Sequence, residues 1–277
     1  MVFDGEFLKR LEALRLAVRH VLRSRREGER AGPRPGGSSV FHSHRTYVQG
    51  DDFRAIDWSL YARLGAFFVR ERIREEAPSL HMVLDTSPSM DFGTPSKADL
   101  ARRLAAALGY LVAGEGGDVT LWTGVRSRAF RGEGASLEYI RAVEKAEPGA
   151  PAASLRRLEG KALVVVVSDF WDEALPDALA PLPAAGHQLT LLHLLAPEEL
   201  APSVRGLARF VDAESGGTAA RYIGEEEVAH YARLMQGHCQ SWRDWARKRE
   251  ASYLRSASDE PFDKVILLYL RGEGVLE

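Results

Sequence analysis

The sequence contains a single cysteine, Cys239, and no asparagine. One cysteine cannot form an intramolecular disulfide, and scarcity of cysteine is typical of proteins in a reducing cytoplasm. Long hydrophobic runs are also missing, because the longest, residues 162–167, is far shorter than the ~20 residues that a membrane-spanning helix needs. Residues 1–18 are amphipathic and charged, without the uninterrupted apolar stretch of a signal peptide. We therefore expect a cytoplasmic protein with no transmembrane segment.

Several motifs of catalysis and ligand binding are absent as well. The chain has no Gly-x-Ser-x-Gly motif, and its glycine-rich stretch at 114–119 lacks the lysine of a P-loop. His42 and His44 alternate as two zinc ligands would, but no Cys-x-x-Cys or His-Glu-x-x-His motif completes such a site. The net charge of -2 and the pI near 6.5 argue against a strongly basic nucleic-acid-binding protein. Any nucleotide chemistry is therefore expected in a partner.

The composition is that of a folded protein, because 45% of the residues are hydrophobic. We divide the chain into four segments. These are an N-terminal basic amphipathic helix and linker (1–39), a signature segment (40–78), an α/β domain (79–224), and a C-terminal helix and final strand (225–277).

The first helix is predicted over residues 3–27, where apolar side chains recur at helical spacing. Its opposite face is rich in lysine and arginine, which indicates contact with solvent, an acidic partner or a membrane surface. Residues 28–39 are rich in glycine, proline and serine, as linkers are. We therefore expect this helix to be a separable arm.

Short apolar strands alternate with helices in the middle of the chain. Strands are predicted at 67–73, 80–85, 118–124, 127–132, 162–170, 187–195, 208–213 and 220–224. Helices are predicted at 97–116, at 136–146 and near 172–182. Helices between buried strands require crossover connections, so the pattern predicts an α/β fold with a mainly parallel, doubly wound sheet and helices on both faces. At the C-terminus we predict a long helix at 225–256 and a last strand at 263–272.

Oxygen-bearing side chains follow two of the predicted strands. Asp85, Ser87 and Ser89 come directly after the strand at 80–85, and Asp169 lies near the end of the strand at 162–170. The carboxyl ends of parallel strands share one edge of a sheet, where ligands gather. Because hard cations take oxygen ligands, the four residues form a candidate magnesium site. The alternative for the Asp-x-Ser-x-Ser stretch by itself is a capped turn leading into the next helix.

The Asp-x-Ser-x-Ser-Met stretch and the later Ser-Asp pair resemble a von Willebrand factor A domain. The resemblance implies a metal-ion-dependent adhesion site made of Asp85, Ser87, Ser89 and Asp169, with a threonine from a second loop. Pro151 stands at the position expected for that threonine, and Ser154 is the nearest substitute. We therefore expect a degenerate site that holds Mg²⁺ weakly or not at all.

Residues 47–63 resemble the signature of the bacterial family known as domain of unknown function 58. Its pattern is approximately Y-x-x-G-D-D-x-R-x-I-D-W-x-x-x-A-R, and every marked position is matched. The polar and aromatic residues singled out in it are Asp51, Asp52, Arg54, Asp57, Trp58 and Arg63. They indicate either an ionic network that clamps the segment or a recognition surface.

The resemblance implies a non-enzymatic adaptor that works with a MoxR-type AAA+ ATPase in chaperone-like maturation of other proteins. The alternative is a Mg²⁺-dependent hydrolase or phosphotransferase that uses Asp85 and Asp169. A phosphoaspartate enzyme would have a second aspartate at position 87, where this chain has serine. Binding of nucleic acid through the arginine-rich first helix is a third class, which the acidic pI disfavours.

Overall fold

The computed structural model describes residues 3–28, 40–48, 51, 53, 56–73, 79–132, 134–158 and 160–272. The chain forms two compact units. The larger unit comprises Met1–Arg25 and Pro78–Glu277, and the smaller comprises Arg26–Ala77. Among the described residues, no helix combines the length and the apolar character needed to cross a membrane.

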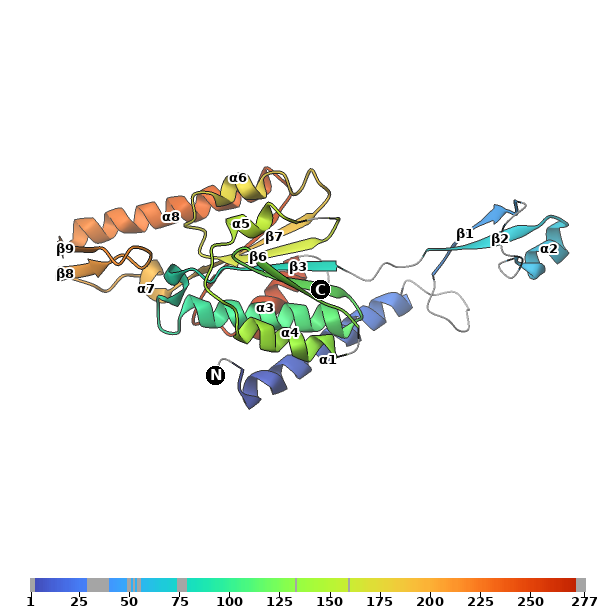
Figure 1. The fold of residues 1–277 in the computed structure, drawn as a ribbon, viewed down its shortest axis with the longest axis horizontal. Helices are drawn as coiled ribbons and strands as arrows, with labels where there is room; N and C mark the ends of the chain where they lie inside the picture. The colour runs from blue at the N-terminus through green and yellow to red at the C-terminus, as the bar shows by residue number, and fades with distance from the viewer. Residues whose placement is uncertain are drawn as a thin grey trace. The chain divides into compact units, whose positions relative to one another are not determined.

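A six-stranded sheet forms the centre of the larger unit (Figure 1). Its strands follow the order β10-β7-β6-β3-β4-β5, and every neighbouring pair is parallel except β4 and β5. The strands are β3 (Ser79–Leu84), β4 (Asp118–Thr123), β5 (Arg126–Phe130), β6 (Leu163–Ser168), β7 (Gln188–Leu195) and β10 (Ser252–Ala257). The expected mainly parallel sheet is therefore confirmed.

Helices cover both faces of this sheet, as predicted (Figure 1). One face packs against α3 (Lys97–Gly114), α4 (Ala135–Glu144) and α9 (Phe262–Gly272), and α1 (Gly5–Gly28) packs in turn on α3 and α9. The other packs against α5 (Ala152–Leu155), α6 (Leu175–Leu179) and α8 (Glu225–Arg247). Val165 and Val167 of β6 belong to the first core, whereas Val164 and Val166 belong to the second. Burial on both faces explains why this strand is apolar throughout instead of alternating.

Helix α1 is part of the core and not the separable arm that we expected. Its apolar stripe, including Phe7 and Leu11 at 1% exposure each, joins the same core as α3 and α9. The Phe7 ring lies 4.8 Å from that of Phe262, and Arg10 forms an ion pair with Asp263. The amphipathic pattern correctly predicts the helix, but it does not say what the apolar stripe packs against.

The C-terminal elements also differ from the prediction. Helix α8 ends at Arg247 instead of continuing to 256, and Glu250 adopts a left-handed conformation (φ 55°) before strand β10. Residues 262–272 form helix α9 instead of a strand, because their buried side chains recur with helical spacing. These are Phe262, Val265, Ile266, Tyr269 and Leu270.

The order of the strands creates a switch point between β3 and β6. From β3 the chain crosses to β4 and β5 at one edge, and it then returns to place β6 on the other side of β3. The backbone N–H of Asp85 donates to the carbonyl oxygen of Val167 at 3.0 Å. The loops that carry Asp85 and Asp169 therefore begin side by side, where ligands bind in doubly wound sheets.

The remaining elements are short helices that follow β3 and β7, a β-hairpin, and the elements of the smaller unit. The 3₁₀ helix η2 (Pro88–Asp91) follows β3, and α7 (Pro197–Leu200) follows β7. Strands β8 (Gly206–Val211) and β9 (Thr218–Ile223) form an antiparallel hairpin in the larger unit. In the smaller unit β1 (Val40–Thr46) pairs with β2 (Phe68–Ile73), and α2 (Trp58–Leu64) precedes β2.

Candidate functional site

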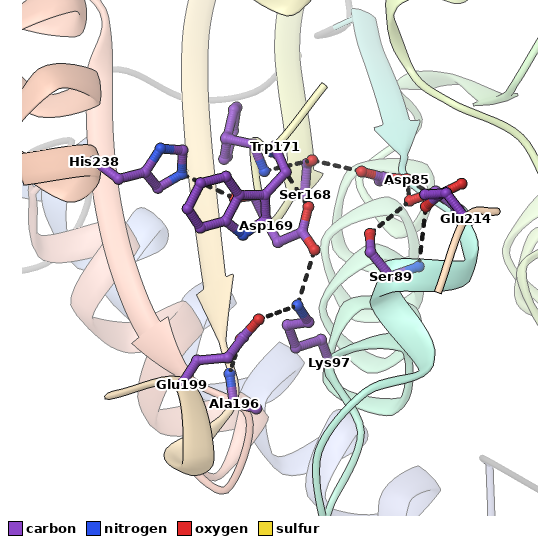
Figure 2. A network of polar contacts seen from close by, with 12 residues as sticks. Asp85, Ser89, Lys97, Ser168, Asp169, Trp171, Ala196, Glu199, Glu214 and His238 are labelled. Carbon is purple, nitrogen blue, oxygen red and sulfur yellow. Dashed lines mark hydrogen bonds and ion pairs between the residues drawn. The ribbon is translucent and has the colours of Figure 1, made fainter. Parts of the chain in front are cut away.

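Asp85 lies at the centre of a group of serine hydroxyls (Figure 2). Its Oδ1 accepts from the backbone N–H of Ser87 at 2.9 Å and from the Ser87 hydroxyl at 2.6 Å. Its Oδ2 accepts from the Ser168 hydroxyl at 2.5 Å. The hydroxyls of Ser87 and Ser89 lie 3.1 Å apart. The Asp-x-Ser-x-Ser spacing therefore brings three oxygen-bearing side chains together, as predicted.

Burial makes this carboxylate unusual. Asp85 is 2% exposed. Its pKa is raised from the ordinary 3.8 to about 6, chiefly because burial disfavours the charged form. Hydrogen bonds from Ser168 and Ser87 oppose the shift, and the charge of Asp169 adds to it. A carboxylate in this state gains stability when a cation approaches, because its charge is only partly compensated by hydroxyls.

Asp169 is paired with a buried lysine (Figure 2). The Lys97 ammonium, 1% exposed, donates to Asp169 Oδ2 at 2.8 Å and to Glu199 Oε1 at 2.7 Å. The other oxygen of Glu199 accepts from the backbone N–H of Ala196 at 2.6 Å, which fixes the start of α7. Buried charges are tolerated when they are paired in this way. One oxygen of Asp169 is therefore committed to an internal cation.

The loop that contains Gly149 and Pro151 lies against the loop that follows β3. The backbones of Thr86 and Gly149 exchange hydrogen bonds of 3.2 and 3.3 Å, and the Thr86 hydroxyl donates to the carbonyl oxygen of Glu147 at 2.7 Å. Gly149 has no room for a side chain, since a Cβ there would lie 2.6 Å from the Cα of Gly124. Pro151 follows this contact and offers no hydroxyl. Ser154 is fully buried and donates to the carbonyl oxygen of Gly124, so it does not replace the missing threonine.

These residues fit a weakly held magnesium ion better than a tightly held one. Asp85, Ser87 and Ser89 provide one carboxylate and two hydroxyls, which are ligands that Mg²⁺ accepts. Asp169 is engaged by Lys97, and Pro151 supplies no side-chain oxygen. Within the described part of the chain, no cluster of three or more His, Cys, Asp or Glu residues is arranged to hold a metal. An ion here would depend on water and on oxygens from a partner.

A carboxylate from the β8–β9 hairpin reaches the same loop. Glu214 lies in the turn between the two strands, and its Oε1 accepts from the backbone N–H of Ser89 at 3.2 Å (Figure 2). The turn is shaped by Asp212, whose Oδ1 accepts from the backbone N–H groups of Glu214 and Ser215 at 2.8 and 3.0 Å. The loop after β3 is therefore able to receive a carboxylate at Ser89.

The signature segment lies in the smaller unit. Asp57 caps α2, because its Oδ1 accepts from the backbone N–H groups of Ser59 and Leu60 at 3.0 and 3.2 Å. Asp51 Oδ2 accepts from the backbone N–H of Val48 at 3.0 Å, and Arg63 is exposed in the last turn of α2. Asp52 and Arg54 lie outside the described residues, as do the side chains of His42 and His44.

Aromatic side chains gather around Trp58, which is 59% exposed. The Tyr61 ring stacks on that of Phe67 with centroids 4.4 Å apart, and Trp58 meets both rings edge-on at 6.1 and 6.2 Å. Phe67 and Tyr61 are 42% and 37% exposed. Trp58 is therefore a member of an exposed aromatic cluster.

Sequence reasoning missed four residues that shape the rim. Ser168 precedes Asp169 directly and is the only one of them with a local signal, since it belongs to the Ser-Asp pair. Lys97, Glu199 and Glu214 come from three separate segments, and their partners lie 72, 102 and 125 residues away. No spacing rule connects side chains over such distances.

The strand order and the oxygen-rich rim define a doubly wound α/β protein with a candidate ligand site at its switch point. The chain belongs to the family DUF58, described as a protein of unknown function, which matches residues 43–238. The chain is also similar to uncharacterized proteins of Mycobacterium bovis and Mycobacterium tuberculosis. Each is 31% identical in an alignment of 254 residues, and the alignment covers 85% of this chain and 80% of the relative.

Two solved structures are also similar to the chain. One is the conserved hypothetical protein BatB from Bacteroides thetaiotaomicron, at 16% identity and a TM-score of 0.42, covering 71% of this chain and 98% of that one. The other is an aerotolerance-related membrane protein from Bacteroides fragilis, at 17% identity and a TM-score of 0.45, covering 72% of this chain and all of that one.

Proposed function

We propose that the protein is a non-enzymatic interaction module of the von Willebrand factor A type, which binds a protein partner at the rim formed by Asp85, Ser87 and Ser89. The observation that carries the proposal is the hydrogen bond from the backbone N–H of Ser89 to Glu214. It supports the proposal because a carboxylate of the chain's own hairpin lies at this rim, and a carboxylate is the group that an acidic partner segment would present. The buried Asp85 and its serine hydroxyls provide the oxygens for a Mg²⁺ ion that such a carboxylate would complete.

The proposed partner is a MoxR-type AAA+ ATPase, acting with this protein in chaperone-like maturation of other proteins in the cytoplasm. The proposal of this partner rests on the resemblance of residues 47–63 to the family signature, and the sequence contains no P-loop of its own. The exposed cluster of Trp58, Tyr61 and Phe67 supplies a second protein-binding surface, since aromatic residues are enriched at interfaces.

A non-enzymatic role is favoured by the bonding of the two rim carboxylates. Asp85 accepts three hydrogen bonds, and Asp169 is paired with Lys97. A phosphoaspartate mechanism needs a free carboxylate oxygen as nucleophile, with an acid nearby to protonate the leaving group. Ser87 occupies the position where that acid would stand two residues after Asp85.

The test is direct binding to a MoxR-type ATPase from the same organism, measured by analytical ultracentrifugation with ATP and Mg²⁺. The wild-type protein is expected to bind, and Asp85→Ala and Ser89→Ala are expected to weaken binding at least ~10-fold, equal to about 1.4 kcal/mol. Asp259→Asn, at an exposed residue of another loop, is the matched control. Binding that is unaffected by the two rim variants would refute the proposed interface.

Phosphate-ester turnover provides the second arm of this test. The proposal predicts no turnover of a generic phosphate ester above background. Turnover that is abolished by Asp85→Ala would refute the non-enzymatic function and show that the protein is a Mg²⁺-dependent hydrolase.

A further inference from the structure

A pocket lined by tryptophans begins directly after Asp169. Its volume is about 350 Å³. The residues that matter here are Trp171, Asp172, Glu173, His238, Trp242 and Trp245, and we call their site the tryptophan pocket. It lies at the lower end of the ~300–1,000 Å³ range of ligand sites. A single long side chain is therefore a suitable occupant.

A residue at the start of the pocket has an unusual backbone conformation. Phe170 adopts a left-handed conformation with φ 59°, although it is not glycine, and its side chain is only 2% exposed. The indole N–H of Trp242 donates to the carbonyl oxygen of Phe170 at 3.2 Å, and the Phe170 and Trp242 rings lie 4.8 Å apart. Residues held in such conformations by their surroundings are concentrated at functional sites.

Aromatic rings that follow Phe170 or come from α8 form one side of the pocket. Trp171 is 47% exposed and stacks on His238, with ring centroids 3.9 Å apart and an interplanar angle of 5°. His238 is fixed in turn, because its Nε2 donates to the carbonyl oxygen of Asp169 at 3.3 Å. Trp242 and Trp245 form a second pair of rings, 5.6 Å apart.

The two residues with charged side chains that line the pocket are both acidic, whereas Arg249 lies outside the lining and over the ring of Trp245. Asp172 and Glu173 line the pocket, and neither lysine nor arginine occurs among its described lining residues. Aromatic faces and carboxylates both attract a cation that is brought between them.

The chain itself contains one contact of an arginine with a tryptophan ring of this pocket. The guanidinium of Arg249 lies over the ring of Trp245, with its carbon 4.3 Å from the ring centroid. A guanidinium is planar and weakly hydrated, so it stacks on indole rings more readily than an ammonium does.

We propose that the tryptophan pocket binds an arginine side chain of a partner protein. The guanidinium would stack on the exposed ring of Trp171 and pair with Asp172 or Glu173, and the aliphatic stem would lie on the apolar lining. The inference rests on the proposed interaction function and deepens it. Because Asp169 and Trp171 are two residues apart, one partner segment can contact the rim and the pocket together.

The test uses the full-length protein labelled with 5-fluorotryptophan, whose five tryptophans give separate ¹⁹F resonances. The probe is the peptide acetyl-Gly-Arg-Gly-amide, and the matched probe carries citrulline, which has nearly the same shape without the charge. We expect saturable shifts of Trp171, Trp242 and Trp245 with the arginine peptide. Trp58 and Trp122, which do not line the pocket, should not shift.

The charge contribution is measured in two independent ways. The citrulline peptide is expected to bind at least ~5-fold more weakly, in line with about 1 kcal/mol for a cation–π contact. The double variant Asp172→Asn, Glu173→Gln should weaken the arginine peptide by a similar factor, and Glu173→Gln alone, at an exposed residue, provides a variant that preserves folding. Trp171→Leu should remove the shifts at Trp242 and Trp245.

Three results would overturn the proposal. They are equal binding of the two peptides, equal shifts at all five tryptophans, and no saturable shift at the solubility limit of the peptide. If binding to the ATPase still depends on Asp85 in that case, the interaction function stands and only the arginine site is lost. If the peptide binds but the ATPase does not, the pocket stands and the proposed partner is wrong.

Discussion

Lys97 and Asp169 form an ion pair of 2.8 Å between side chains that are 1% and 2% exposed. The lysine stands in the first turn of α3, and the aspartate follows β6. A fixed ammonium thus neutralises one of the two rim carboxylates, while Asp85 is left to serine hydroxyls. The rim is thus divided into a half whose carboxylate is paired with a lysine and a half whose carboxylate is bonded only to neutral groups of Ser87 and Ser168.

Removing the buried lysine charge should destabilise the protein strongly. Lys97→Met leaves Asp169 and Glu199 without their shared cation, and breaking a buried pair on one side costs about 3–5 kcal/mol. Urea unfolding followed by circular dichroism measures the loss. The control is Lys264→Met, because Lys264 is 62% exposed in its pair with Glu260, and its loss should cost less than ~0.5 kcal/mol. Similar losses in the two variants would contradict the structural role of the buried pair.

Magnesium binding should be weak and should depend on Asp85. Calorimetry with Mg²⁺ or Mn²⁺ is expected to give a dissociation constant in the millimolar range, roughly 10⁻³ M, for the wild type. Asp85→Ala should abolish the heat of binding. Pro151→Thr should strengthen binding, because it returns a hydroxyl to the second loop. Tight binding by the wild type would refute a degenerate site, and no gain from Pro151→Thr would show that position 151 is not equivalent to the threonine.

Asp85 should make the stability of the wild type fall as the pH rises. Its pKa is raised to about 6 from 3.8, so the folded state favours the protonated carboxyl. This contribution is fully present below about pH 4 and is lost as the pH rises through about 6. Asp85→Asn removes the titrating group. The free energy of unfolding of this variant minus that of the wild type should therefore increase by about 1–3 kcal/mol when the pH is raised from 4 to 7.5. Urea unfolding across this range checks it, with Asp259→Asn as the control. Parallel pH profiles for wild type and Asp85→Asn would show that Asp85 titrates normally.

Helix α1 should contribute to global stability. Leu11→Ala, at 1% exposure, should cost about 2–5 kcal/mol, the usual loss for a large side chain removed from a core. Leu16→Ala, on the same helix at 60% exposure, is the matched control and should change stability by less than ~0.5 kcal/mol. Thermal unfolding separates them. An equal and small effect of both substitutions would restore the interpretation of a separable arm.

The contact of Glu214 with Ser89 should protect the β8–β9 hairpin. Glu214→Ala removes the acceptor, and hydrogen exchange of the amides in residues 206–223 should accelerate about 3–10-fold, as expected for one partly exposed hydrogen bond. Glu226→Ala, at an exposed position of α8, serves as the control. Unchanged exchange in Glu214→Ala would mean that the hairpin is held by other contacts.

The sequence predicted the elements with strong local patterns and the residues at their ends. Buried strands such as residues 162–170 are apolar throughout, and parallel strands must end at one edge, so Asp85 and Asp169 were expected there. The strand predicted at 263–272 was wrong, because a short apolar run fits a strand or a helix and only packing decides between them. The burial of Lys97 could not be predicted, because a lysine in the first turn of a helix is usually exposed and no local pattern connects it with Asp169.

The contact between α1 and α9 also has a consequence for synthesis on the ribosome. Arg10 donates to Asp263 across 253 residues of chain, and at ~5–20 residues per second that separation takes on the order of 10–50 s to translate. For this interval the apolar stripe of α1 cannot contact the helix that covers it in the finished protein. The contact between α1 and α9 is therefore among the last tertiary contacts that the nascent chain can form, whereas the contacts of α1 with α3 become possible much earlier.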